Sequence, residues 1–445
     1  MMDGPTPPTR TLFWRKGAAL AACAVFVLAA ILYAAGKGPL YHAMGTVFGF
    51  ELWRFAFLDT DTVLSAVRCF RAGVDAYLIN PCDDLGRVYT YSPLWMLLTA
   101  LPVTTAWITP VGLVVDTAFL ASLFLLPIPR NAASLAVLSL ATVSGASAFA
   151  LERGNNDLVL FALVAAAAWL LARSPRARSL GYALAFLAGL LKYYPMAVMG
   201  AALREKSGRF LVVAASAIIA TALFGAIVWS DLLKAFANIP VGSVFDDMFG
   251  STTVPTAIDL QLGATGHIRA VLHPIMILAA VGIALGLGLA TSTRSAVARL
   301  TEAEAAFLLV GGLMIVGCFF TAQNIGYRAV HLILCMPGLL ALAVSAPNRR
   351  FKIAPGAAVL LLWAMSWRHT AENVGDVIGG QDGARIGYLG GWVVRELLWW
   401  SVVTLLLSTI VAMLSSAPIA RHLFLKLGRS LPGDKPDSRH GGDPA

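Results

Sequence analysis

The chain has 445 residues, of which 58% are hydrophobic and only 13% are charged. Soluble domains carry about a quarter charged residues, so this composition excludes an ordinary water-soluble protein and indicates an integral membrane protein. The net charge of +9 does not indicate nucleic-acid binding, because Lys and Arg fall in short clusters between apolar runs, as membrane orientation requires.

The apolar runs predict an all-α, polytopic bundle of roughly ten to twelve transmembrane helices. The first run, 17–36, follows basic residues and has no small-residue cleavage site, so we expect a retained first helix that leaves the cytoplasm. The later runs are 93–129, 133–150, 158–172, 180–202, 210–229, 271–290, 305–320, 330–344, 353–367 and 392–413. Every predicted inner loop is basic, which predicts a multi-pass cell (inner) membrane protein with both termini cytoplasmic.

We expect residues 1–427 to form one transmembrane domain with two long outer loops, at about 37–92 and about 230–269. Residues 428–445, rich in Gly, Pro, Asp and Ser, are expected to be a disordered cytoplasmic tail. The run 180–202 is interrupted by Lys192 and Pro195, which predicts two short or tilted helices that meet at Lys192. A Gly-rich loop is expected between Trp367 and the last span.

The cysteines and acidic residues indicate no cofactor. Cys69 and Cys82 share the first outer loop, and they form a disulfide only if that compartment is oxidising. No spacing of Cys, His, Asp and Glu resembles a zinc site, so we predict no metal. Asp246 and Asp247 in the second loop either bind an acceptor or a divalent cation, or are simply solvated.

The first outer loop holds the likeliest chemistry. Apolar residues recur at helical spacing over 63–74, which predicts an amphipathic helix from Asp61 to Ala72 at the membrane surface. Asp59, Thr60 and Asp61 stand at its N-terminus, where they can cap the free backbone amides. Two carboxylates exceed what a cap needs, so we interpret Asp59 as a general base, with Asp61 as the second candidate.

Three short motifs follow one another between residues 55 and 210. The first is Asp59 with Gly73, Tyr77 and then Tyr91-Ser92-Pro93; the second is RGNND at 153–157; the third is GLLKYYPMAV at 189–198. In order and separation they resemble the polyprenol-phosphate-mannose-dependent glycosyltransferases of family 87, which have Gly-Gln-x-Asn at the second motif and an apolar run ending in Lys-x-x-Pro at the third.

The resemblance implies a GT-C fold and an inverting transfer of a hexose, mannose in that family, from a polyprenyl-phosphate-linked donor. Asp59 would deprotonate a hydroxyl of a lipid or glycan acceptor at the outer membrane face, without a cofactor. Members often carry a Ser-rich, His-containing stretch after a late span. The corresponding stretch here, TAQNIGYRAVH at 321–331, lacks the serines and offers Tyr327, Arg328 and His331 as candidate substrate-binding residues, beside Tyr91 of the first motif.

A lipid-linked phosphate at the outer interface needs nearby cations, and few stand beside the predicted outer ends of spans: Arg153, Lys192, Arg328 and Arg395. A charge inside a membrane is costly and is by default a functional-site hypothesis. Arg can grip a phosphate with two hydrogen bonds, whereas Lys acts as a point charge.

Each of these residues also has a structural interpretation. Arg153 can pair with Glu152, and Lys192 can snorkel to the interface from a helix end. Asn155 and Asn156 are candidate substrate-binding residues, or one of them caps the helix that follows, with Asp157 favouring its positive end. His331 is a packing histidine or a ligand.

The alternative function is a transporter or flippase of lipid-linked sugars, and a polymerase of lipid-linked glycans is a third. A transporter predicts internal symmetry and charges near the bilayer midplane. Asp116 lies inside a predicted span, where it is either a proton-relay carboxylate or hydrogen-bonded to a neighbouring helix. The unequal loops and the lack of a visible repeat favour the enzyme.

Overall fold

The computed structural model describes residues 8–52, 55–239, 242–321, 323–346 and 348–418, and the predicted tail at 428–445 lies outside them. The fold is all-α and, in the described residues, has only two short strands, β1 (Met248–Phe249) and β2 (Asn324–Ile325), which pair antiparallel. The helices are α1 (Pro8–Ala34), α2 (Gly38–Phe48), α3 (Leu58–Arg71), η1 (Pro93–Ala100), η2 (Thr105–Trp107), α4 (Ile108–Ser122), η3 (Leu123–Leu125), α5 (Ala132–Thr142), α6 (Gly145–Arg153), α7 (Asn156–Leu171), α8 (Pro175–Leu191), η4 (Tyr194–Arg204), α9 (Ser207–Ala237), α10 (Thr253–Gln261), α11 (His267–Leu289), α12 (Thr291–Val297), α13 (Glu302–Thr321), η5 (Gly326–His331), α14 (Leu332–Ser345), α15 (Arg349–Leu362) and α16 (Ala364–Ser415).

Eight helical segments in the described residues are long and apolar enough to cross a bilayer, fewer than the ten to twelve predicted. The segments are Trp14–Ala34, Thr105–Leu125, Ala132–Arg153, Ser207–Ala237, His267–Leu289, Glu302–Thr321, Gly326–Ser345 and Ala364–Ser415. The shortfall arises because three of the predicted spans become helices of 14 to 17 residues, α7, α8 and α15. The length and composition of these helices indicate a multi-pass membrane protein.

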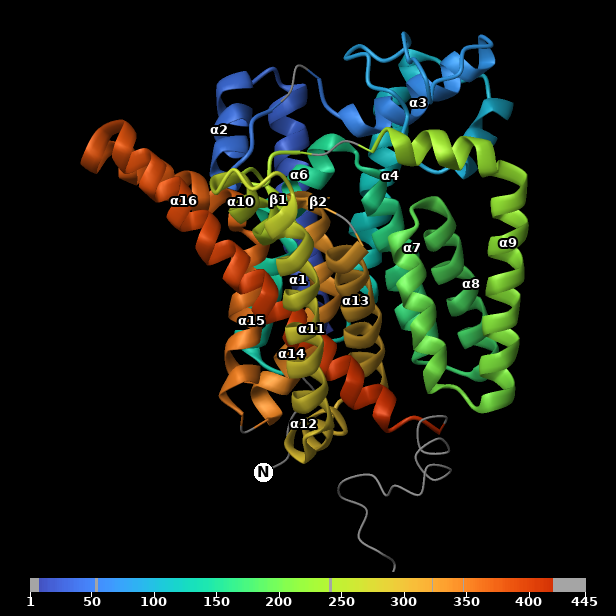
Figure 1. Cartoon of the computed structure of the whole chain (residues 1–445), viewed down its shortest axis with the longest axis vertical. Coiled ribbons are helices and arrows are strands. Elements are labelled where there is room, and N and C mark those ends of the chain that lie inside the picture. The colour runs from blue at the N-terminus through green and yellow to red at the C-terminus, as the bar shows by residue number, and fades with distance from the viewer. Residues whose placement is uncertain (1–7, 53–54, 240–241, 322, 347, 419–445) are drawn as a thin grey trace, which may run out of the picture.

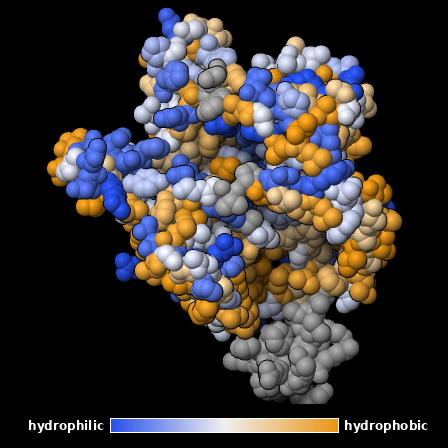
Figure 2. Space-filling model, turned by 45° about the horizontal axis from the view of Figure 1, so that its top comes forward, coloured by the Kyte–Doolittle hydropathy of each residue, from blue (hydrophilic) through white to orange (hydrophobic). Residues whose placement is uncertain are grey.

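The long helices run side by side, and several of the smaller elements lie at one end of the bundle (Figure 1). This end carries α2, α3 and the β1–β2 pair, and we call it the α3 end. Hydrophilic residues are concentrated there, whereas hydrophobic residues cover much of the visible flank (Figure 2). The difference is expected of a protein whose flank faces lipid and whose ends face water.

The segment between α8 and η4 confirms the predicted break. Helix α8 ends with Lys192 as its C-cap residue, and the 3-10 helix η4 starts at Tyr194 with Pro195 in its first turn. Proline suits the first turn of a helix because the amide that it lacks would have no partner there. The side chain of Lys192 is therefore presented at a break between two packed helices.

Helix α3 differs from its prediction in two respects. It begins at Leu58 rather than Asp61, and it is buried inside the α3 end rather than spread on a membrane surface, because ten of its fourteen residues are buried. A disulfide joins Cys69, near its end, to Cys82 in the following loop, with the two Cα atoms 5.8 Å apart. The bond ties that loop to the helix.

The expected Gly-rich loop before the last span is instead a helical hairpin. Within α16 the backbone departs from helical geometry at Gly379 and Gly380, where the chain reverses. The two arms approach so closely that a Cβ built on Gly375 would lie 2.1 Å from the carbonyl oxygen of Gly383. Glycine at these positions therefore permits a hairpin, which projects from the α3 end of the bundle (Figure 1).

Candidate functional site

The first turn of α3 docks on the turn between α6 and α7. Gly154 adopts a left-handed conformation with φ +52°, and a Cβ there would lie 2.5 Å from the hydroxyl of Thr60. That hydroxyl donates a hydrogen bond to the Gly154 carbonyl at 2.7 Å. The amide of Phe57 donates to the Glu152 carbonyl at 2.8 Å. These contacts fix Asp59 beside the residues that begin α7.

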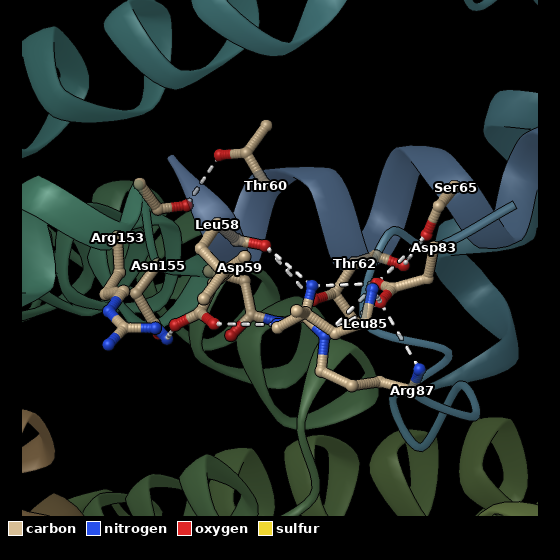
Figure 3. Close-up of polar contacts among 12 residues, drawn as sticks. Leu58, Asp59, Thr60, Thr62, Ser65, Asp83, Leu85, Arg87, Arg153 and Asn155 are labelled. Atoms are coloured by element: carbon tan, nitrogen blue, oxygen red, sulfur yellow. Dashed lines mark hydrogen bonds and ion pairs between the residues drawn. The ribbon is translucent and has the colours of Figure 1, made fainter. Parts of the chain in front are cut away.

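Asp59 is the centre of the charged groups on this side of α3. Its carboxylate accepts a hydrogen bond from Asn155 Nδ2 at 2.5 Å and lies 3.8 Å from an Arg87 nitrogen. Arg153 and Asn155 lie on one side of Asp59 and Arg87 on the other (Figure 3). Burial raises the pKa of Asp59, and the Asn155 hydrogen bond and the charges of Arg153, Arg87 and Lys192 oppose that rise. The side chain keeps 14% of its surface exposed, so the carboxylate is not fully sealed inside the protein.

Asp61 does not join Asp59. Two residues along a helix are separated by about 200° around its axis, so the two carboxylates point to opposite sides. Asp61 is buried and pairs with Arg68 at 3.3 Å, and Arg68 also donates to the Cys82 carbonyl at 2.9 Å. The capping interpretation is wrong for both carboxylates, because the N-cap residue is Phe57 and has no side-chain cap hydrogen bond.

A second cluster forms around Asp157, in the first turn of α7. Its buried carboxylate accepts hydrogen bonds from Lys192 Nζ at 2.9 Å, from the Tyr194 hydroxyl at 2.8 Å and from Arg328 Nε at 3.3 Å. Lys192 also donates to Asn156 Oδ1 at 2.9 Å. Two cations and one carboxylate leave a net charge of +1 in this group.

The cluster draws on segments that are far apart in sequence. The Tyr194 hydroxyl lies 2.7 Å from His331 Nε2, which links η4 to the end of η5. Arg328 also donates to Asn324 Oδ1 in β2 at 2.5 Å. Strand β2 pairs with β1 of the second long loop, so that loop supports the position of Arg328.

The remaining predicted site residues lie around these two groups. The Tyr91 ring faces Lys192 Nζ at 5.2 Å from its centroid. Arg153 pairs with Glu152 at 3.1 Å, as its structural interpretation proposed, and lies over the Phe149 ring. Tyr327 is buried against the same ring.

Four predicted residues thus converge on Asp157 or a partner of it: Asn156, Lys192, Arg328 and His331. Asn155 connects the two groups, because its Oδ1 accepts from the Asp157 amide at 2.7 Å while its Nδ2 holds Asp59. Asn155 is therefore the N-cap of α7, as predicted. Asn156 Nδ2 is buried and has no hydrogen-bond partner among the described residues.

Sequence reasoning missed the central position of Asp157 and the contact of Tyr194 with it. Asp157 was interpreted as a favourable charge near a helix start, and Tyr194 as a ring that stacks on a sugar or anchors at the membrane interface. The available signal was an acid that opens an almost wholly apolar helix, since such a charge needs a partner inside the protein. Lys192 and Arg328 were predicted as cations, but nothing in the sequence paired them with Asp157.

Arg395 and the paired acids of the second loop form a separate structural group. Asp247 pairs with Arg368 at 2.6 Å, and Arg395 donates to the Asp246 carbonyl at 2.7 Å and pairs with Glu396 at 2.9 Å. Asp247 is therefore not merely solvated, and Arg395 serves the attachment of this loop to the hairpin of α16.

Among the described residues, no group of three or more His, Cys, Asp and Glu side chains is arranged to hold a metal ion. Comparison of the chain with known proteins finds no matching protein family, no matching curated protein and no matching solved structure. The functional argument therefore rests on the geometry of the two groups joined by Asn155.

Proposed function

We propose that this protein is a membrane glycosyltransferase that moves a hexose from a polyprenyl-phosphate-linked donor to a lipid or glycan acceptor at the α3 end, which would be the outer face. Asp59 is the general base in this proposal. The observation that carries it is the Asp59 carboxylate, held by Asn155 next to a cluster of two cations, buried Lys192 and partly buried Arg328, that has a net charge of +1.

The cation cluster suits a phosphodiester. A donor phosphodiester carries one negative charge, which matches the +1 left when Asp157 offsets one of the two cations. The unpartnered Nδ2 of Asn156 provides a buried hydrogen-bond donor for a phosphate or sugar oxygen. The guanidinium of Arg328 can donate two hydrogen bonds to a phosphate, and the ammonium of Lys192 acts as a point charge.

The chemistry balances without a cofactor. Asp59 takes the proton of the acceptor hydroxyl while the hydroxyl oxygen bonds to the anomeric carbon. The bond from that carbon to the phosphate oxygen breaks, and its electron pair leaves with the lipid phosphate. Lys192 and Arg328 would stabilise the charge that develops on the leaving phosphate. Inversion follows from direct displacement, and mannose is the sugar suggested by the resemblance to family 87.

The environment of Asp59 supports its role as base. Burial raises its pKa, which moves the basicity of the carboxylate closer to that needed near neutral pH. Asn155 binds Oδ2 of Asp59, whereas Oδ1 lies 3.8 Å from a nitrogen of Arg87, too far for a hydrogen bond. Oδ1 is therefore the oxygen that can accept the proton of the acceptor hydroxyl. Asp61 is turned away and paired with Arg68, so it serves as the matched control carboxylate.

The test is transfer of labelled sugar by the purified protein in proteoliposomes. Polyprenyl-phosphate-mannose, other polyprenyl-phosphate-hexoses and the corresponding nucleotide sugars are supplied with membrane glycolipids as acceptors. We expect transfer only from a lipid-linked donor, without added metal. Movement of intact lipid-linked sugar across the bilayer, with no transfer from any donor, would favour the transporter or flippase instead.

A further inference from the structure

A large apolar cavity borders the α3 end on the side of α1, α2, α4 and α6. It has a volume of about 410 Å³ and is lined mainly by small and aromatic apolar side chains from these helices. Its lining includes Tyr33 and Leu113, whose side chains are 55% and 41% exposed on the flank of the bundle. A lipid chain can therefore reach the cavity sideways from the membrane.

One wall carries a carboxyl group with no partner. Asp116, in the middle of α4, is fully buried and lines the cavity, and neither of its carboxyl oxygens has a hydrogen-bond partner among the described residues. Among the described residues, the hydrogen bond to a neighbouring helix that was one of its two interpretations is therefore not made. A buried polar group is costly unless something hydrogen-bonds to it, so a ligand with a hydrogen-bond donor would satisfy this site.

The cavity and the Asp59 site share a wall. Phe57 and Glu152 line the cavity, and their backbones are joined by a hydrogen bond of 2.8 Å. Asp59 follows Phe57 by two residues, and Asn155 follows Glu152 by three. The cavity thus adjoins the site through this wall, and neither Lys192 nor Tyr194, from the break between α8 and η4, lines it.

The charges of the two sides differ. The charged residues in the cavity wall, among the described residues, are two acids, Asp116 and Glu152, and Glu152 pairs with Arg153, which does not line the cavity. No Lys or Arg of the described residues lines it. A phosphate group would meet no cation among these described wall residues, whereas a hydroxyl would find a carboxyl oxygen to which it can donate.

We propose that this cavity binds the apolar chain of a neutral, hydroxyl-bearing lipid and that this lipid is the acceptor rather than the donor. The assignment as acceptor rests on the proposed function, but the lipid binding does not. The donor then approaches Asp59 from the Lys192 and Arg328 side, and the acceptor from the Asp116 side. Asp59 lies between them, where a base must stand to take a proton from the acceptor.

Photo-crosslinking tests the binding directly. The probes are two compounds with the same long alkyl chain and a diazirine in the chain, one ending in an alcohol and the other in a monophosphate. The purified protein is labelled in nanodiscs and the labelled peptides are mapped. We expect the alcohol to label the cavity-lining peptides of α1, α4 and α6 in preference to the phosphate.

Two substitutions make the mapping specific. Ala29→Trp fills the cavity from α1 and should abolish labelling, whereas Ala24→Trp on the exposed face of the same helix should leave it unchanged. Asp116→Leu removes one hydrogen-bond acceptor and should weaken the alcohol's binding about fivefold, with Asp116→Asn largely restoring it.

Preferential labelling by the phosphate, or no labelling of these peptides by either probe, would overturn the proposal. If labelling behaves as expected and no sugar transfer is ever found, the lipid site stands and the proposed function fails. If transfer is found and Ala29→Trp raises KM for the donor instead of the acceptor, the assignment to the acceptor is wrong.

Discussion

The side-chain amide of Asn155 serves two helices at once: its oxygen caps α7 at the Asp157 amide, and its nitrogen holds the carboxylate of Asp59 on α3. Asp59 is therefore positioned by the same residue that starts the helix carrying Asp157. This arrangement couples the proposed base to the cation cluster. A mutation of Asn155 can separate its two roles, the cap of α7 and the hydrogen bond to Asp59.

Asn155→Ser should keep the cap and lose the support of Asp59. Serine is about as good an N-cap as asparagine, but its hydroxyl is too short to do both tasks. We expect near-normal thermal stability and a fall in sugar transfer of at least about tenfold, since small misplacements of a reacting group are costly. Asn131→Ala removes a comparable cap from α5, at the Ser134 amide, far from Asp59 in sequence.

Transfer at the wild-type rate in Asn155→Ser would show that the hydrogen bond to Asp59 has no catalytic value. Asn131→Ala should lower stability by about 1 kcal/mol and leave the rate per folded molecule unchanged.

Arg328→Gln and Lys192→Met should weaken binding of the donor phosphate. Hydrogen bonds to charged groups contribute about 1.5–3 kcal/mol, so each loss should raise the Kd for a short-chain polyprenyl phosphate by about 10- to 100-fold. Titration of a fluorescent polyprenyl phosphate measures this directly. Arg204→Gln is the control, because Arg204 pairs with exposed Glu302 at the start of α13. An unchanged Kd in both cluster variants, with the fold intact, would show that the donor phosphate does not bind at this cluster.

The dependence of kcat/KM on pH should report Asp59. A general base works only when it is deprotonated, so the rate falls as the pH drops through its pKa, which burial raises above the ordinary aspartate value. Arg87 opposes that rise, so Arg87→Gln should move the acidic limb of the profile to higher pH. Arg87→Lys retains the charge and should restore the limb. A limb that moves to lower pH in Arg87→Gln would contradict the assignment.

The hairpin of α16 makes a prediction about stability alone. Gly375→Ala would place a Cβ 2.1 Å from the Gly383 carbonyl oxygen, so the arms must separate and the thermal stability should fall. Gly356→Ala in α15 meets no atom within 4 Å and should instead raise stability by about 0.5–1 kcal/mol. Equal Tm changes in the two variants would mean that the arms are not packed as described.

Patterns that depend on neighbouring residues were predictable from the sequence. The apolar runs gave the helical class, and Lys192 with Pro195 predicted the break between α8 and η4. A cap at Asn155 or Asn156 was predictable because capping depends only on the next two or three residues, and the structure assigns it to Asn155.

Features that depend on packing were not predictable in the same way. Helix α3 was expected at the surface because its periodicity shows one apolar face, but the disulfide and the docking of Thr60 bury the other faces too. The convergence of Lys192 and Arg328 on Asp157 requires three helical segments to meet, which no local pattern encodes. The hairpin segment was predicted to be a loop because glycine normally disfavours helices. Here glycine is required instead, because the two helical arms pack closely at Gly375 and Gly383.

The most direct test of the central claim compares Asp59→Asn with Asp61→Asn in transfer from a polyprenyl-phosphate-hexose, with donor binding measured on the same preparations. The account predicts that Asp59→Asn abolishes transfer while it binds donor normally, and that properly folded Asp61→Asn retains transfer. Transfer by Asp59→Asn at a rate close to that of the wild type would contradict it.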